Sequence, residues 1–192
     1  STETEFAGSH FDLVHGEPDN PGVVPAPDTD AAIHYRHLHA AMQAGLIVSC
    51  HDVSEGGLAV ALAEMCIGGR LGASINNLPH DDLATALFSE SVGRMIVEVE
   101  ERSAPAFRRI MDDDAVVLGE VSESGLLSLP EVEPILVSDL VDAFNSRIDV
   151  VPASFDANGD DTQPATERGE AGLTGAVLTG ERHQDQRRNG EG

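Results

Sequence analysis

The feature that most constrains this chain is a pair of apolar runs, residues 46–50 and 58–67, joined by a turn that ends in Gly56-Gly57. Glu64 is the one charged residue of the second run, so a helix there is apolar on nearly every side. Such a helix has to be buried in the protein interior. We therefore predict a buried strand over Leu46–Cys50, a turn, and a buried helix from Leu58 to Ile67 that is ended by Gly68-Gly69.

The rest of the chain alternates short helical and strand patterns. A helix is expected from near Thr29, with Asp28 or Thr29 as its N-cap, up to Gly45. Over residues 94–100, Met95, Val97 and Val99 alternate with Ile96, Glu98 and Glu100, which predicts a strand. The other expected elements are strands over 72–76, 115–121 and 125–129 and helices over 81–87, 104–111 and 138–144, the last with Ser138 as N-cap. This order predicts an α+β fold in which helices pack on a mixed β-sheet.

Composition divides the chain into three parts. Four prolines within residues 1–28 forbid a long helix, so we expect an extended connector from an upstream domain, with a short strand around Phe11–Val14. The α+β domain is expected over residues 29–150. Residues 151–192 are polar and acidic, and we expect a disordered tail. Because the first residue is not Met, we interpret the chain as part of a longer protein.

The charge balance excludes several partners. There are 34 acidic and 11 basic side chains, all of the basic ones Arg, and the formal net charge is −23. Binding to nucleic acid or to an anionic membrane depends on clustered Lys and Arg, so neither is expected. The acidic surface favours a protein adapted to concentrated salt, the alternative being an acidic protein from a GC-rich genome. No apolar run reaches the ~20 residues of a membrane span, and Cys50 and Cys66 are expected as free thiols in a reducing cytoplasm.

The turn before the buried helix is the strongest candidate site. Unpaired amide N–H groups at a helix start can hold a phosphate or a carboxylate, and glycine lets that group approach closely. Asp52 could bind magnesium directly or through water. In the alternative interpretation the same residues only cap and pack the helix. The candidate residues of this turn are His51, Asp52, Ser54, Gly56 and Gly57.

A second polar group precedes the strand at 94–100. Glu90 and Arg94 could each orient a polar ligand, with Ser89 and Ser91 beside them. The alternative is a simple strand start with an ion pair between Glu90 and Arg94. Three further polar side chains, His34, His37 and His39, are expected on a solvated helix face and not in a metal site, because 37 and 39 point apart on a helix.

Three segments together resemble a known family. They read GLIVSCHDVSEGGLAVALAEMCIGGRLGASI, LFSESVGRMIVEVE and VVLGEVSESGLLSL. In this order they resemble the last domain of the large subunit of formylglycinamidine ribonucleotide synthases, over roughly residues 28 to 148. The resemblance implies the second C-type domain of an enzyme that pairs such domains with N-type ATP-binding domains. Selenophosphate synthetases and small-molecule kinases of the same superfamily are the alternatives, with a non-catalytic assembly domain as a third.

The resemblance also implies a chemistry. ATP phosphorylates the amide oxygen of formylglycinamide ribonucleotide, and ammonia displaces the phosphate to give the amidine. Magnesium is required, and the ammonia comes from glutamine through a glutaminase subunit and a small bridging subunit. Residues that match Asp52 and Glu90-Ser91 bind metal and substrate in the first half of such enzymes. The second half holds a structural nucleotide, so we expect ligand proximity but no catalytic residue in this chain, and no synthase activity from the chain alone.

Overall fold

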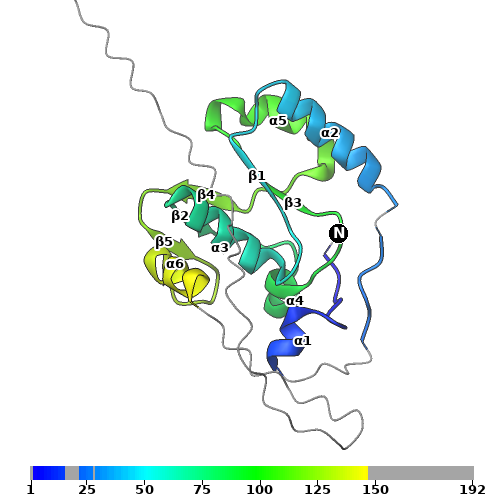
Figure 1. Cartoon of the computed structure of the whole chain (residues 1–192). Helices are drawn as coiled ribbons and strands as arrows, with labels where there is room; N and C mark the ends of the chain where they lie inside the picture. The colour runs from blue at the N-terminus through cyan, green and yellow to red at the C-terminus, as the bar shows by residue number, and fades with distance from the viewer. Residues whose placement is uncertain (1, 16–21, 28, 147–192) are drawn as a thin grey trace, which may run out of the picture. The chain divides into compact units, whose positions relative to one another are not determined.

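The computed structural model describes residues 2–15, 22–27 and 29–146 (Figure 1). The tail expected at 151–192 and the proposed cap Asp28 lie outside these residues. The helices are α1 (His10–His15), α2 (Ala31–Gln43), α3 (Gly57–Gly69), α4 (Leu83–Phe88), α5 (Ala104–Met111) and α6 (Val137–Asn145), with 3-10 turns at Glu101–Ser103 and Asp112–Asp114. The strands are β1 (Ser49–Asp52), β2 (Gly72–Ile75), β3 (Met95–Glu98), β4 (Gly119–Ser122), β5 (Leu126–Ser128) and β6 (Ile135–Leu136).

The strands form two sheets. One has four strands in the order β4-β2-β5-β6, in which β2 is antiparallel to β4 and parallel to β5, and β5 is antiparallel to β6. This sheet is mixed, as predicted, and helices pack on it. The other sheet is an antiparallel pair in which His51 of β1 lies opposite Ile96 of β3. The α+β class is therefore confirmed, whereas the separate β1–β3 pair was not expected.

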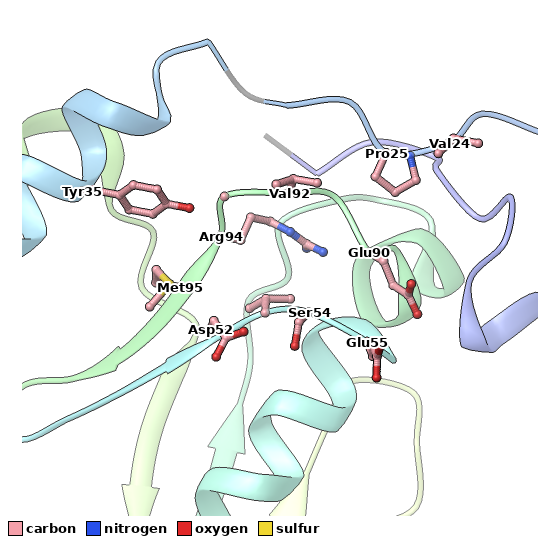
Figure 2. A pocket seen from close by; sticks show the side chains of 12 residues that line it. Val24, Pro25, Tyr35, Asp52, Ser54, Glu55, Glu90, Val92, Arg94 and Met95 are labelled. Atoms are coloured by element: carbon pink, nitrogen blue, oxygen red, sulfur yellow. The ribbon is translucent and has the colours of Figure 1, made fainter.

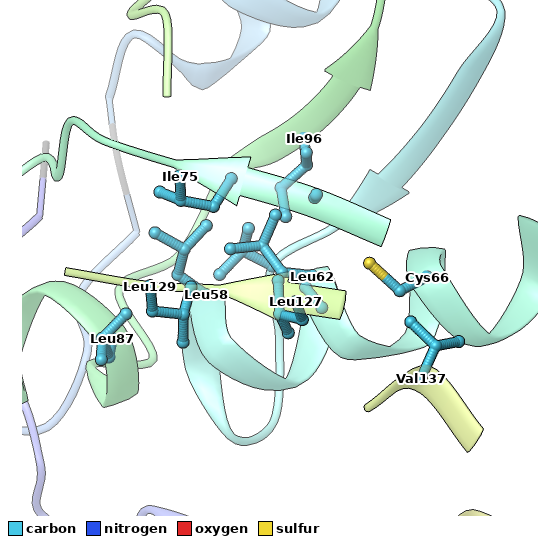
Figure 3. Close-up of a cluster of buried hydrophobic side chains, with 12 residues drawn as sticks. Leu58, Leu62, Cys66, Ile75, Leu87, Ile96, Leu127, Leu129 and Val137 are labelled. Carbon is cyan, nitrogen blue, oxygen red and sulfur yellow. The ribbon is translucent and has the colours of Figure 1, made fainter. Parts of the chain in front are cut away.

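Helix α3 carries the main hydrophobic core (Figure 3). Its residues Leu58 and Leu62 are 3 % and 5 % exposed and belong to one cluster with residues of β2, β3, β5, α4 and α6. Burying a leucine-sized side chain contributes about 1.5–3 kcal/mol, so this cluster is a main source of stability. The prediction of a buried helix is confirmed for this face. On another face, Val60 remains 39 % exposed.

A second, smaller cluster joins α2 to α5. Ala41 of α2 is fully buried, together with Phe107 and Met111 of α5, and Ile47 and Val97 pack against them. Figure 1 shows the two helices side by side beyond one end of the β1–β3 pair. The chain that leaves α2 at Gly45, where φ is +67°, is thereby directed into β1.

Several boundary predictions were wrong for identifiable reasons. The short strand expected around Phe11–Val14 is helix α1. Phe11 stacks on His15 with ring centroids 4.0 Å apart, and its ring is tilted against that of Phe88 at 5.3 Å. The buried strand expected at 46–50 begins at Ser49 and is half-buried, because its sheet has two strands.

Helix ends also differ from expectation. Helix α3 includes Gly68 and ends at Gly69, and its C-cap residue Arg70 takes the left-handed conformation. Helix α2 starts at Ala31, close to the expected start near Thr29, but its N-cap residue is Asp30 and not Asp28 or Thr29. The N-cap position of α6 is Leu136, so Ser138 lies inside the helix and is not its cap. Across the described residues, no helix has the length and apolar composition needed to cross a membrane.

Candidate functional site

A hollow of about 440 Å³ lies where β1 ends, α3 begins and the chain enters β3 (Figure 2). Four of the nine candidate residues line it: Asp52, Ser54, Glu90 and Arg94. The other five, His51, Gly56, Gly57, Ser89 and Ser91, lie next to it but outside its lining. Residues of both polar motifs therefore meet at this hollow, because each motif lies at the end of a strand.

The start of α3 is occupied by a carboxylate of the chain itself. The amide N–H of Gly56, the N-cap residue, donates to Glu90 Oε1 over 2.8 Å. The same oxygen accepts from the amide of His10 over 3.0 Å, at the start of α1. A helix start favours negative charge, and Glu90 supplies it. The sequence allowed a phosphate or a carboxylate at this point, and the structure has a carboxylate.

Gly57 is needed for close packing. Its φ is +68°, and a Cβ added there would lie 2.7 Å from the carbonyl oxygens of both Leu87 and Ser89. A side chain at this position would collide with backbone that cannot move independently. Gly57 thus lets the first turn of α3 sit directly on the end of α4.

His51 faces α3, while Asp52 faces solvent. The ring of His51 contacts Glu64 Oε2 through Nε2 at 3.1 Å and the carbonyl oxygen of Asp52 through Nδ1 at 2.6 Å. The carboxylate of Asp52 is 65 % exposed at the rim of the hollow. Asp52 is therefore accessible to a ligand, whereas His51 ties β1 to α3.

The serines of the second motif are buried and bonded to the N-terminal segment. Ser89 is fully buried and donates to the carbonyl oxygen of Glu3 over 2.6 Å. Ser91, 3 % exposed, donates to the carboxylate of Glu5 over 2.5 Å and accepts from the Glu3 amide over 3.1 Å. These two hydroxyl groups bind the chain itself.

Arg94 is directed at backbone oxygens. Its guanidinium donates to the carbonyls of Ser89 (2.5 Å) and Ser91 (3.0 Å), so the ion pair with Glu90 that the sequence allowed is not formed. Burial lowers the pKa of Arg94, and the negative charge of Glu5 opposes that shift. The guanidinium stays charged, since arginine begins from a very high pKa. Arg94 therefore stabilises the loop that carries Glu90.

Sequence reasoning missed several residues of this region. Tyr35, Glu55 and Met95 line the hollow, together with Val24, Pro25, Val53, Val92 and Gly93. Tyr35, on α2, is 45 % exposed. Glu5 is 7 % exposed in a segment that carried no functional signal. Their positions depend on pairings between distant parts of the chain, which a local pattern does not contain.

The histidines of α2 lie at a different place. His34 Nε2 and His37 Nδ1 each contact a carboxylate oxygen of Asp114 at 3.3 Å, with about a third of each ring exposed. Within the described part of the chain, no group of three His, Cys, Asp or Glu side chains is arranged to hold a metal ion. These contacts tie α2 to the turn after α5.

Comparison with known families identifies the domain. The family model described as AIR synthase related protein, C-terminal domain, matches residues 4–130. The chain belongs to the AIR synthase related family. The match starts within the segment that was expected to be a connector and includes both polar motifs.

A curated relative points to one branch of the AIR synthase related family. The chain is 38 % identical over 130 residues to phosphoribosylformylglycinamidine synthase subunit PurL of Lactobacillus helveticus (strain DPC 4571). The aligned region is 67 % of this chain but 17 % of that relative. The chain thus spans only a small part of the length of this relative.

Solved structures show the AIR synthase related fold. Thermotoga maritima PurL complexed with FGAR matches with a TM-score of 0.56 at 20 % identity, over 67 % of this chain and 25 % of that one. The PurLQS structure from the same organism also gives 0.56 at 20 % identity, over 85 % and 28 %. At this level of identity the likeness establishes the architecture.

Proposed function

We propose that this chain is the C-terminal part of a phosphoribosylformylglycinamidine synthase, an ATP-dependent ligase of purine biosynthesis. The observation that carries the proposal is the 38 % identity over 130 residues to the Lactobacillus helveticus PurL subunit. This identity favours the synthase over a selenophosphate synthetase or a small-molecule kinase of the same superfamily. In this assignment residues 29–150 form the domain, residues 1–28 lead into it from upstream domains and contribute contacts to its hollow, and residues 151–192 form an acidic tail.

The proposed reaction makes an amidine from an amide. ATP transfers its terminal phosphoryl group to the amide oxygen of formylglycinamide ribonucleotide, and ammonia then displaces phosphate at that carbon. The ammonia derives from glutamine through a glutaminase subunit, joined to the synthase by a small bridging subunit, in the cytoplasm. The nucleophile of this reaction is ammonia, and the resemblance to the second half of such enzymes implies a structural nucleotide site, so we assign no catalytic residue to this chain.

The residues of the hollow fit a magnesium ion better than a phosphate at the start of α3. Mg²⁺ is commonly held by one or two carboxylates, with waters and phosphate oxygens as its other ligands. The exposed carboxylate of Asp52 suits such a role, and the ion would neutralise phosphate charge. A phosphate on the Gly56 amide would instead meet the carboxylate of Glu90, which accepts that N–H group. We therefore propose Asp52 as the metal ligand, with Ser54 beside it.

The remaining candidate residues take supporting roles in this proposal. His51, Gly56 and Gly57 fix the turn that presents Asp52, while Ser89, Glu90, Ser91 and Arg94 fix the opposite loop. A nucleotide near this hollow would be structural, as the resemblance to the second half of such enzymes implies. The apolar side chains of Tyr35, Val92 and Met95 offer contact surface to such a ligand.

A chimera tests the assignment. The 130-residue region of the Lactobacillus helveticus subunit is replaced by the matching region of this chain, and ADP formation is measured with formylglycinamide ribonucleotide, ATP, magnesium and ammonia. The chimera should be active, and the present chain alone should be inactive. A folded chimera without activity would count against the proposal. Activity of the chain alone would refute the claim that it needs the other domains of the synthase.

The metal role is tested in the active chimera. Asp52→Asn should reduce nucleotide retention and activity at equal folded fraction, because the amide is a poor magnesium ligand. Glu123→Gln, an exposed change in the turn between β4 and β5, is the matched control and should leave both unchanged. If Asp52→Asn behaves like this control, the turn is structural.

A further inference from the structure

The N-terminal segment enters the hollow through one buried carboxylate. Glu5 is 7 % exposed, which is unusual for an acidic residue unless it is bonded. Its Oε2 accepts from the hydroxyl of Ser91 over 2.5 Å. Its Oε1 accepts from the amide of Ala26 over 3.4 Å. One side chain thus contacts two segments that are 65 or more residues apart along the chain.

These two segments form neighbouring walls of the hollow. Ala26 follows Val24 and Pro25, which belong to its lining, and Ser91 precedes Val92, which belongs to its lining too. Figure 2 shows Pro25 and Val92 close to each other above Asp52 and Ser54. The carboxylate of Glu5 lies at the point where both walls are anchored.

Further contacts extend the connection to the start of α3. Thr2 accepts from Arg94 over 3.2 Å, and Thr4 lies 3.4 Å from Thr85 through their hydroxyl oxygens. The loop held in this way carries Glu90, whose carboxylate accepts from the Gly56 amide. A displacement of residues 2–5 would remove partners of both serines and one partner of Arg94, and the loop that positions Glu90 would be less constrained.

We infer that Glu5 is a positioning residue of the hollow: its carboxylate joins the two walls, and residues 2–5 are an integral part of the site. The buried hydroxyls of Ser89 and Ser91 serve this attachment and are not ligand contacts. The inference depends on the proposed function only for the identity of what the hollow binds.

Amide hydrogen exchange in the full chain tests this inference. Glu5→Ala removes both contacts, so the amides of Glu3, Ala26 and Gly56 should exchange roughly tenfold faster or more. Amides of β2 and β5 serve as the internal reference and should change less. Glu5→Gln retains the shape and can still accept from Ala26 and bond to Ser91, so it should restore most of the protection. Glu123→Ala, at an exposed position, is the matched control.

Two results would overturn the inference. Unchanged exchange at Ala26 and Gly56 in Glu5→Ala would show that the walls hold without this carboxylate. Equal acceleration of the β2 and β5 amides would show that Glu5 contributes to global stability alone. ADP binding, measured in parallel in the active chimera, separates the two proposals: if the chimera with the unsubstituted region does not bind ADP, the nucleotide assignment fails while the exchange result on Glu5 still stands.

Discussion

The carboxylate of Glu90 accepts the amide N–H of Gly56 at 2.8 Å and thereby caps the helix on which the core is built. Gly56 has no side chain that could cap α3, and the cap comes from a loop 34 residues further along the chain. The two polar motifs are therefore physically one unit: the second motif supplies the charge that the first motif's helix start attracts.

Removing this carboxylate should destabilise the fold. Glu90→Ala leaves the amides of Gly56 and His10 without their partner, which costs about 1–3 kcal/mol for bonds to a charged group. Glu90→Gln keeps an acceptor oxygen and should cost less. Urea unfolding measures both, and Glu55→Ala, at the exposed neighbouring position, should change the free energy of unfolding by less than about 0.5 kcal/mol. Equal effects at positions 55 and 90 would contradict the capping role.

Gly57 should be intolerant of any side chain. Gly57→Ala places a methyl group against the carbonyls of Leu87 and Ser89 and forces a positive φ on alanine, so we expect a loss of about 1–3 kcal/mol. Gly68 provides a control in the same helix, because a Cβ there meets nothing within 4 Å. Gly68→Ala should be neutral or stabilising by up to about 1 kcal/mol. The prediction fails if thermal or urea unfolding shows that both substitutions change the free energy of unfolding in the same direction.

The sequence was sufficient where a local pattern decides the structure. Helix α5 begins and ends at the residues expected, Ala104 and Met111, and the apolar run of α3 identified the core helix. Asp52, Ser54, Glu90 and Arg94 do meet at one hollow, since each lies near a strand end. Periodicity and glycine positions carried this information.

The sequence was insufficient where contacts between residues far apart in the chain determine the structure. Strand β6 has two residues and exists because it pairs with β5, so no local pattern marks it. Helix α1 is held by contacts of Phe11 with Phe6 and Phe88, which a strand-like run of apolar residues does not reveal. Glu5 is separated from Ser91 by 86 positions. A single sequence cannot show such pairings.

The charge of Asp52 should control the reactivity of Cys50. These residues lie two apart on β1 and thus on one face of the strand. Burial raises the pKa of the Cys50 thiol, and the negative charge of Asp52 raises it further. Asp52→Asn should therefore lower that pKa and speed alkylation by iodoacetamide at about pH 8, where the thiolate is the reacting species.

Cys66 is the internal control for this measurement. Its pKa is raised by burial alone, so its alkylation rate should be the same in wild type and in Asp52→Asn. Mass spectrometry of the two labelled peptides distinguishes the sites. If Cys66 accelerates as much as Cys50, the substitution has loosened the fold and the electrostatic explanation is wrong.

Stability at acid pH should depend on the cap of α4. Asp82 accepts from the Thr85 amide over 2.8 Å, and this bond lowers the pKa of Asp82. A lowered pKa means that the contribution is present above the ordinary aspartate pKa and is lost as pH falls through the folded-state pKa. Asp82→Asn keeps a capping oxygen without a titrating charge.

The free energy of unfolding should then fall less steeply from about pH 5 to about pH 2 in Asp82→Asn than in wild type. Asp81→Asn changes the adjacent exposed aspartate and should retain the wild-type slope. Urea titrations at a series of pH values give the slopes. Identical slopes for wild type and Asp82→Asn would show that the cap does not contribute to the acid sensitivity.

Salt should stabilise this chain, because its net charge of −23 is unscreened at low ionic strength. The Debye length falls from about 30 Å at 0.01 M to about 8 Å at 0.15 M, so added potassium chloride removes repulsion between carboxylates on different parts of the surface. The midpoint of thermal unfolding should therefore rise across this range. Neutralising two exposed carboxylates with Glu131→Gln and Glu133→Gln removes part of the repulsion and should make the rise shallower. A midpoint that is flat or falls with salt would refute the salt-adapted interpretation of the surface, whereas a rise that the double substitution leaves unchanged would place the relevant repulsion elsewhere on the chain.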